Sequence, residues 1–157
     1  MRTVLAFLIV SSTITFALSI GVSSARPQPD NNPTLTGIWR IRFILSGVEK
    51  NLVLNTHPKG TATLKLLDTG PDNKPVADPV AASWAQTTGG RISISTNVEL
   101  PLGTCCREVG TLVFKGKFTS GNSISGTTIF IGSTEDEESI LKFRAAVGTF
   151  VAAKESL

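Results

Sequence analysis

The sequence predicts an all-β fold, an eight-stranded antiparallel up-and-down barrel, with a two-sheet β-sandwich as the alternative. From Thr36 onward, short runs of Val, Ile, Leu, Phe and Thr recur about every ten residues, and turn-forming clusters separate them. No apolar pattern with a helical period is long enough to indicate a helix. Consecutive antiparallel strands pair with their sequence neighbours, and eight of them close into a barrel whose interior holds packed side chains or one small ligand.

The first expected strand has the clearest pattern. Trp39, Ile41 and Phe43 alternate with Arg40 and Arg42, which is typical of a strand with one buried and one solvated face. Leucines alternate in the same way in the next two runs. In order, the expected strands span residues 38–46, 49–56, 61–67, 80–86, 91–97, 110–118, 122–131 and 140–152.

Turn and loop signals separate these strands. A turn is expected over residues 57–60, because Pro58 fixes φ and Gly60 readily adopts a positive φ. Residues 68–79 contain three Pro and one Gly, which is typical of a long loop. The acidic run 135–138 precedes the last strand, and we expect a solvated loop or the first turn of a short helix there.

The N-terminus has the three-part pattern of a secretory signal peptide over residues 1–25. Arg2 supplies a positive charge, an apolar stretch follows, and Ser23 and Ala25 are small residues suited to a cleavage site. A retained membrane helix is the alternative, but Ser and Thr interrupt the stretch and no basic cluster follows it. We expect a secreted or periplasmic protein with no membrane span in the mature chain, a flexible Pro-rich leader over 26–35 and a barrel over 36–154.

Composition excludes several functional classes. The 157 residues include one His, two Cys and no Tyr, so most familiar catalytic and metal-binding sets are missing from the sequence. The formal net charge of +3 comes from basic residues spread along the chain and not clustered among aromatics, so we expect no nucleic-acid partner. No cofactor and no metal site are predicted.

The residues Thr36, Gly37, Ile38 and Trp39 form a G-x-W motif where the first strand begins. This motif resembles the first-strand motif of the calycin group, which contains lipocalins, fatty-acid-binding proteins and avidins. The resemblance implies that Trp39 closes one end of the barrel and packs against an Arg from near the last strand, a role that falls to Arg144. The sequence departs from the group in lacking a clear central lipocalin motif, a C-terminal helix and the Tyr residues that avidins use around their ligand.

A second motif, Asp68-Thr69-Gly70 after two leucines, resembles the active-site signature of aspartic proteases. The resemblance implies a homodimer in which two carboxylates share a proton. However, Pro71 stands where Ala or Ser is usual, and a Pro-rich loop follows. An ordinary turn with a bond from the Asp68 side chain to the backbone is the favoured interpretation.

Cys105 and Cys106 are adjacent, and neighbours cannot form a disulfide with ordinary geometry. Three interpretations remain open: a strained vicinal disulfide, thiols that bridge to a second chain or hold a soft metal, or two reduced cysteines. We favour the vicinal disulfide as a structural element, because neither a His base nor a C-x-x-C spacing accompanies the pair. His57, the only His, lies in a turn and is interpreted as a surface residue.

These patterns predict an exported, non-enzymatic β-barrel that binds a small apolar ligand or a protein partner and works as a monomer. Two alternatives are kept: the dimeric aspartic protease, and a surface interaction module without a cavity. The side chains that we expect to line or fill the barrel share one face of their strands, and they are Trp39, Phe43, Leu54, Leu64, Phe114 and Phe130.

Overall fold

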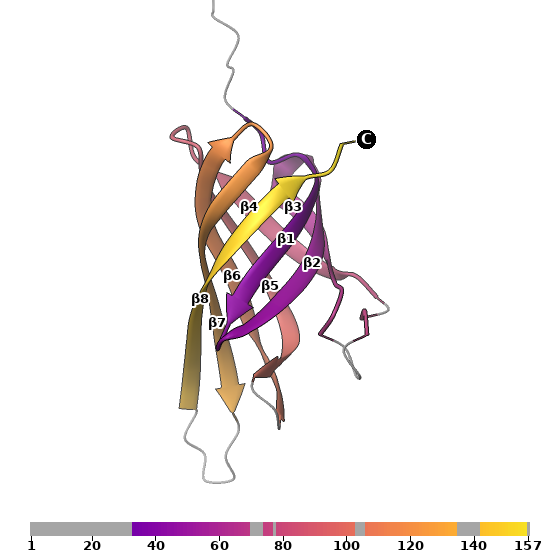
Figure 1. Ribbon diagram of the computed structural model, residues 1–157, viewed down its shortest axis with the longest axis vertical. Helices are drawn as coiled ribbons and strands as arrows, with labels where there is room; N and C mark the ends of the chain where they lie inside the picture. Colours follow the sequence, from indigo (N-terminus) through magenta and orange to yellow (C-terminus); the bar gives the residue numbers. More distant parts are fainter. Residues whose placement is uncertain (1–32, 70–73, 77, 103–105, 135–141, 157) are drawn as a thin grey trace, which may run out of the picture. The chain divides into compact units, whose positions relative to one another are not determined.

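The computed structural model describes residues 33–69, 74–76, 78–102, 106–134 and 142–156. These residues form a closed barrel of eight antiparallel strands in sequence order (Figure 1), which confirms the predicted barrel and excludes the sandwich. The expected signal peptide lies outside the described residues, and so does most of the leader. The strands are β1 (Gly37–Leu45), β2 (Val48–Thr56), β3 (Thr61–Leu66), β4 (Val80–Gln86), β5 (Arg91–Leu102), β6 (Cys106–Ser120), β7 (Ser123–Thr134) and β8 (Lys142–Lys154).

The barrel closes where β8 meets β1, the yellow and indigo strands of Figure 1. In this pairing Phe43 lies opposite Phe150, and Trp39 lies opposite Lys154. Closure removes the free sheet edges that would otherwise invite pairing with another chain. A single turn of 3-10 helix, η1 (Pro58–Gly60), connects β2 to β3 where the turn was predicted.

Strands β5 and β6 are longer than the sequence pattern predicts. Most of the expected gap between residues 97 and 110 is instead paired strand, in which Leu100 lies opposite Glu108 and Pro101 opposite Arg107. Apolar alternation continues through Val98 and Leu100, which are both buried. Pro101 is tolerated because β4 pairs with β5 only as far as Thr96, so one side of β5 needs no partner there.

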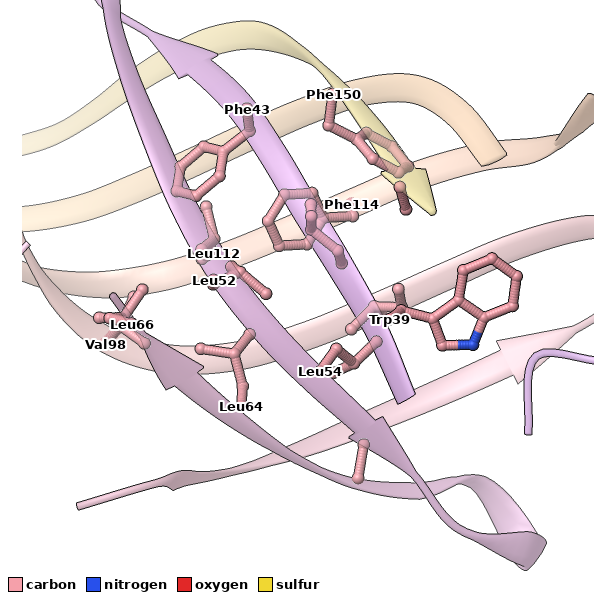
Figure 2. Packing of buried hydrophobic residues seen from close by; sticks show 14 of the residues in the cluster. Trp39, Phe43, Leu52, Leu54, Leu64, Leu66, Val98, Leu112, Phe114 and Phe150 are labelled. Carbon is pink, nitrogen blue, oxygen red and sulfur yellow. The ribbon is translucent and has the colours of Figure 1, made fainter. Parts of the chain in front are cut away.

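The barrel interior is packed with apolar side chains (Figure 2). Phe114 lies at its centre, with ring centroids 5.4 Å from Phe43 and 5.1 Å from Phe150 in edge-to-face geometry. Trp39 makes a third such contact with Phe118 at 5.9 Å. The six side chains expected in the interior are all fully buried, namely Trp39, Phe43, Leu54, Leu64, Phe114 and Phe130.

Glycines on the inner face of β6 make room for these rings. A Cβ atom on Gly116 would lie 2.8 Å from Cζ of Phe150, and one on Gly110 would lie 2.7 Å from Cζ of Phe130. Both distances are shorter than any contact between carbon atoms allows. The long phenylalanines therefore pack over bare backbone, and the alternation of large and absent side chains fills the barrel.

Candidate functional site

The two ends of the barrel differ. In an up-and-down barrel alternate connections lie at the same end, so residues 57–60, 87–90 and 121–122 share one end with the start of β1 and the C-terminus. We call this the closed end. The connections after β1, β3, β5 and β7 share the opposite end, which we call the loop end (Figure 1).

The closed end is sealed by the segment before β1. Leu35 is fully buried, and its carbonyl accepts a hydrogen bond from Nε1 of Trp39 at 2.7 Å and another from the hydroxyl of Thr56. The amide of Leu35 donates to Oε1 of Gln86 at 3.1 Å, and the Gln86 side chain donates in turn to the carbonyl of Pro33 at 2.7 Å. Side chains of β1, β2 and β4 thus bond to the backbone of this segment. These bonds satisfy backbone groups that burial would otherwise leave unpaired.

The cation beside Trp39 is Lys154. Its Nζ lies 5.6 Å from the centroid of the Trp39 ring, a cation–π distance. The structure does not bring Trp39 and Arg144 together, because Arg144 lies opposite Gly132, ten residues before Lys154 on the same strand. At about 3.3 Å per residue, that separation spans most of the length of the barrel.

The loop end carries a polar group of residues that we call the loop-end cluster: Lys50, Asp68, Thr69 and Arg107. Lys50 lies on the inner face of β2, in step with the buried Leu52 and Leu54, and only 4% of its surface is exposed. Its strand partner on β1 is Phe43. An ammonium group therefore occupies a position where the strand pattern places aliphatic side chains.

The charge of Lys50 is disfavoured by its surroundings. Burial is the main cause and lowers the pKa of Lys50 from its ordinary value of 10.5. Asp68 opposes that effect by attraction, and Arg107 adds to it by repulsion. Among the residues that the structure describes, no acceptor lies within hydrogen-bonding distance of the Lys50 ammonium.

Asp68 holds the chain that leaves β3. Its Oδ1 accepts a hydrogen bond from the amide of Asn51 at 3.0 Å, and its Oδ2 accepts one from Nδ2 of Asn51 at 2.8 Å. Both carboxylate oxygens are thus used to fix the exit of β3 against β2. The Asp68 side chain thus bonds to the backbone of a neighbouring strand, and the turn expected after Asp68 falls on residues 70–73, outside the described residues.

Arg107 connects the β5–β6 hairpin to the same chain segment. Its Nη1 donates to the carbonyl of Thr69 at 2.5 Å, and its Nε donates to Oε1 of Glu99 at 2.8 Å. The Thr69 side chain is fully buried, and its hydroxyl has no hydrogen-bond partner among the described residues. The Thr128 hydroxyl on the inner face of β7 is also buried and has no hydrogen-bond partner among the described residues.

The remaining residues singled out in the sequence lie apart from this cluster. His57 is exposed at the closed end, where its carbonyl accepts a hydrogen bond from Nε1 of Trp84 at 2.9 Å. Gly70, Pro71 and Cys105 lie outside the described residues, as does the acidic run 135–138. Cys106 begins β6, its side chain lies outside the described part of the structure, and all three interpretations of the cysteine pair remain open.

Comparisons with known proteins give no family for this chain: no family model, curated protein or solved structure matches it. Over the described ranges, the structure contains no helix long and apolar enough to cross a membrane.

Lys50 is the functional candidate that sequence reasoning missed. The alternation that assigns Leu52 and Leu54 to the buried face of β2 also assigns Lys50 to it, two residues earlier. A lysine in step with buried leucines near the start of a strand is therefore the signal that could have found it. Arg107 has no such signal, because its contact with Thr69 joins residues that are 38 positions apart.

Proposed function

We propose that this protein is an exported, non-enzymatic binding protein that takes a small, mostly apolar ligand carrying an acidic group at the loop end of its barrel. The signal-peptide pattern of residues 1–25 supports export. The Lys50 ammonium is the observation that carries the rest of the proposal.

Desolvation of the Lys50 ammonium costs free energy relative to the same group in water. A carboxylate from a ligand would offset that cost, because charge-assisted hydrogen bonds are about twice as strong as neutral ones. Only 4% of the Lys50 surface is exposed among the described residues. Both carboxylate oxygens of Asp68 already accept hydrogen bonds from Asn51. The hydroxyl of Thr69 adds a further unpartnered donor at the same end of the barrel.

The neighbours of Lys50 suit the apolar part of such a ligand. Phe43 lies opposite it on β1, Leu52 follows it on the same face of β2, and Leu66 lies opposite Leu52 on β3. The aromatic packing of Phe114 fills the middle of the barrel, so the ligand is expected to enter at the loop end and stop there.

Binding of a matched pair of probes tests this proposal. The purified protein is titrated with a fluorescent long-chain carboxylate and with the alcohol of the same chain. We expect the carboxylate to bind about 10- to 100-fold more tightly, the range of a hydrogen bond to a charged group. Lys50→Met should remove this preference.

Lys65→Met is the matched control, because Lys65 is exposed on the neighbouring strand β3 and points outward. It should leave the preference unchanged. Equal binding of the two probes by the wild-type protein, or an undiminished preference in Lys50→Met, would contradict the proposal.

Binding to a protein partner is the second candidate, and a separate observation favours it. Large apolar side chains are exposed on the outer face of neighbouring strands, and they are Ile44, Val48, Val109, Ile131, Val147 and Val151. Exposed apolar surface that is continuous across strands marks protein contact sites. Co-purification of a second chain, lost in a variant with Val147→Ser and Ile131→Ser, would support this candidate.

A further inference from the structure

Three cations gather at one place on the outer face of β5 and β6. Arg91 lies directly opposite Lys117, and Lys115 follows two residues away on the same face of β6. All three side chains are exposed. Like charges directly opposite each other on an antiparallel sheet repel and destabilise it, so this arrangement has a cost in the free protein.

No acidic group offsets these charges in the described part of the chain. The ion pairs of Arg40 with Glu155 and of Arg107 with Glu99 include none of Arg91, Lys115 and Lys117. The outward neighbours of the three cations are hydroxyl residues instead, with Ser93 opposite Lys115 and Ser125 opposite Lys117.

The cations surround a groove of about 540 Å³. Thr87, Ser93 and Ser125 are among the residues that line it. Gly116 and Gly126, which lie opposite each other on β6 and β7, also line it, so bare backbone forms part of its surface. A volume in this range is typical of small-molecule sites, and it leaves space beyond a single inorganic ion.

We propose that this groove binds a tetrahedral oxyanion, the phosphate or sulfate ester group of a soluble ligand. An anion between Arg91 and Lys117 replaces their repulsion with two attractions, and Lys115 supplies a third. The hydroxyls of Ser93 and Ser125 donate to the remaining oxygens. The groove lies on the outside of the barrel, so this site is independent of the loop-end cluster and of the function proposed for it.

Inorganic sulfate and phosphate are the probes that test this site. Each is titrated into the ¹⁵N-labelled protein at constant ionic strength, with chloride as the balancing anion, and backbone amide shifts are followed. We expect saturable shifts at residues 91–93, 115–117 and 125–126, together with a rise in Tm that chloride does not reproduce. In Lys115→Gln/Lys117→Gln the affinity should fall at least tenfold.

The double variant also reports on folding. Because it removes like-charge repulsion, its Tm in chloride alone should equal or exceed that of the wild type. Lys65 is an exposed lysine on β3, away from the groove, and Lys65→Gln is the control. This variant should keep the full response to sulfate. The proposal is overturned if the double variant responds to sulfate as the wild type does, if chloride has the same effect, or if only vesicles of anionic lipid bind.

Discussion

Lys50 places an ammonium group where an aliphatic side chain would pack without electrostatic cost. It is buried on the inner face of β2, where Phe43 lies opposite it on β1 and Leu52 follows it on the same face. Leu or Met at this position would give a more stable protein than Lys50. The simplest reason for a lysine here is that its charge serves the function of the protein. The function proposed above assigns that charge to an interaction with an anion.

The pH dependence of stability tests the state of Lys50. Burial lowers its pKa in the folded protein, so the unfolded chain binds this proton more tightly. The free energy of unfolding should therefore rise with pH between the lowered folded value and 10.5, and Lys50 should contribute no further change below that window. Urea denaturation at pH 7 and pH 10 measures the effect.

Lys50→Met is the comparison that isolates this contribution. At pH 7 and without ligand, the variant should be more stable than the wild type by about 1 kcal/mol or more, because it removes the cost of burying the charge. The difference should shrink at pH 10. A difference that stays constant between the two pH values would show that the Lys50 ammonium is solvated.

Residue-scale prediction succeeds where strand alternation determines the outcome. Trp39, Phe43 and Phe114 were placed in the interior by period-2 patterning alone, and they are buried there. The partner of Trp39 could not be obtained in this way, because it depends on the register between β1 and β8. That register brings Lys154 to the ring, not Arg144.

At the scale of strands, the glycines of β6 decide how the interior is filled. The Gly116 backbone lies under the Phe150 ring, and a Cβ atom there would be 2.5 Å from the carbonyl oxygen of Ser125 on β7. The strand has no freedom to move away, because it is paired on both sides, with β5 and with β7. Close approach, and not a special φ, is therefore what requires glycine at this position.

Gly116→Ala should destabilise the protein by about 1–3 kcal/mol, the usual cost of overpacking a core. Gly121→Ala is the matched control, because nothing lies within 4 Å of a Cβ atom at that turn position. It should change the free energy of unfolding by less than about 0.5 kcal/mol. Equal effects of the two substitutions in urea denaturation would contradict the packing described here.

The strands themselves were largely predictable, and the exceptions have a physical cause. The sequence pattern ended β5 near residue 97, where Pro101 and Gly103 signal a turn. In the structure the hairpin continues to Leu102, since Pro101 lies on the part of β5 that has no β4 partner. The turn propensity of proline is a property of the single residue. Whether the missing N–H of Pro101 costs a hydrogen bond depends instead on where the neighbouring strand β4 ends.

For the whole molecule, the barrel is sealed at one end and polar at the other. Leu35 seals the closed end through hydrogen bonds with Trp39 of β1, Thr56 of β2 and Gln86 of β4. Polar residues near the loop end, by contrast, include Lys50, whose charge burial disfavours, and the buried hydroxyl of Thr69, which has no partner among the described residues. This asymmetry is consistent with the proposed binding barrel, whose ligand would enter at the loop end.

Native mass spectrometry of the protein purified from its export compartment, before and after mild organic extraction, tests the central claim most directly. The account predicts a monomer that carries one small acidic molecule, which extraction removes and Lys50→Met fails to retain. A ligand-free monomer, or a bound molecule retained equally by Lys50→Met, would contradict it.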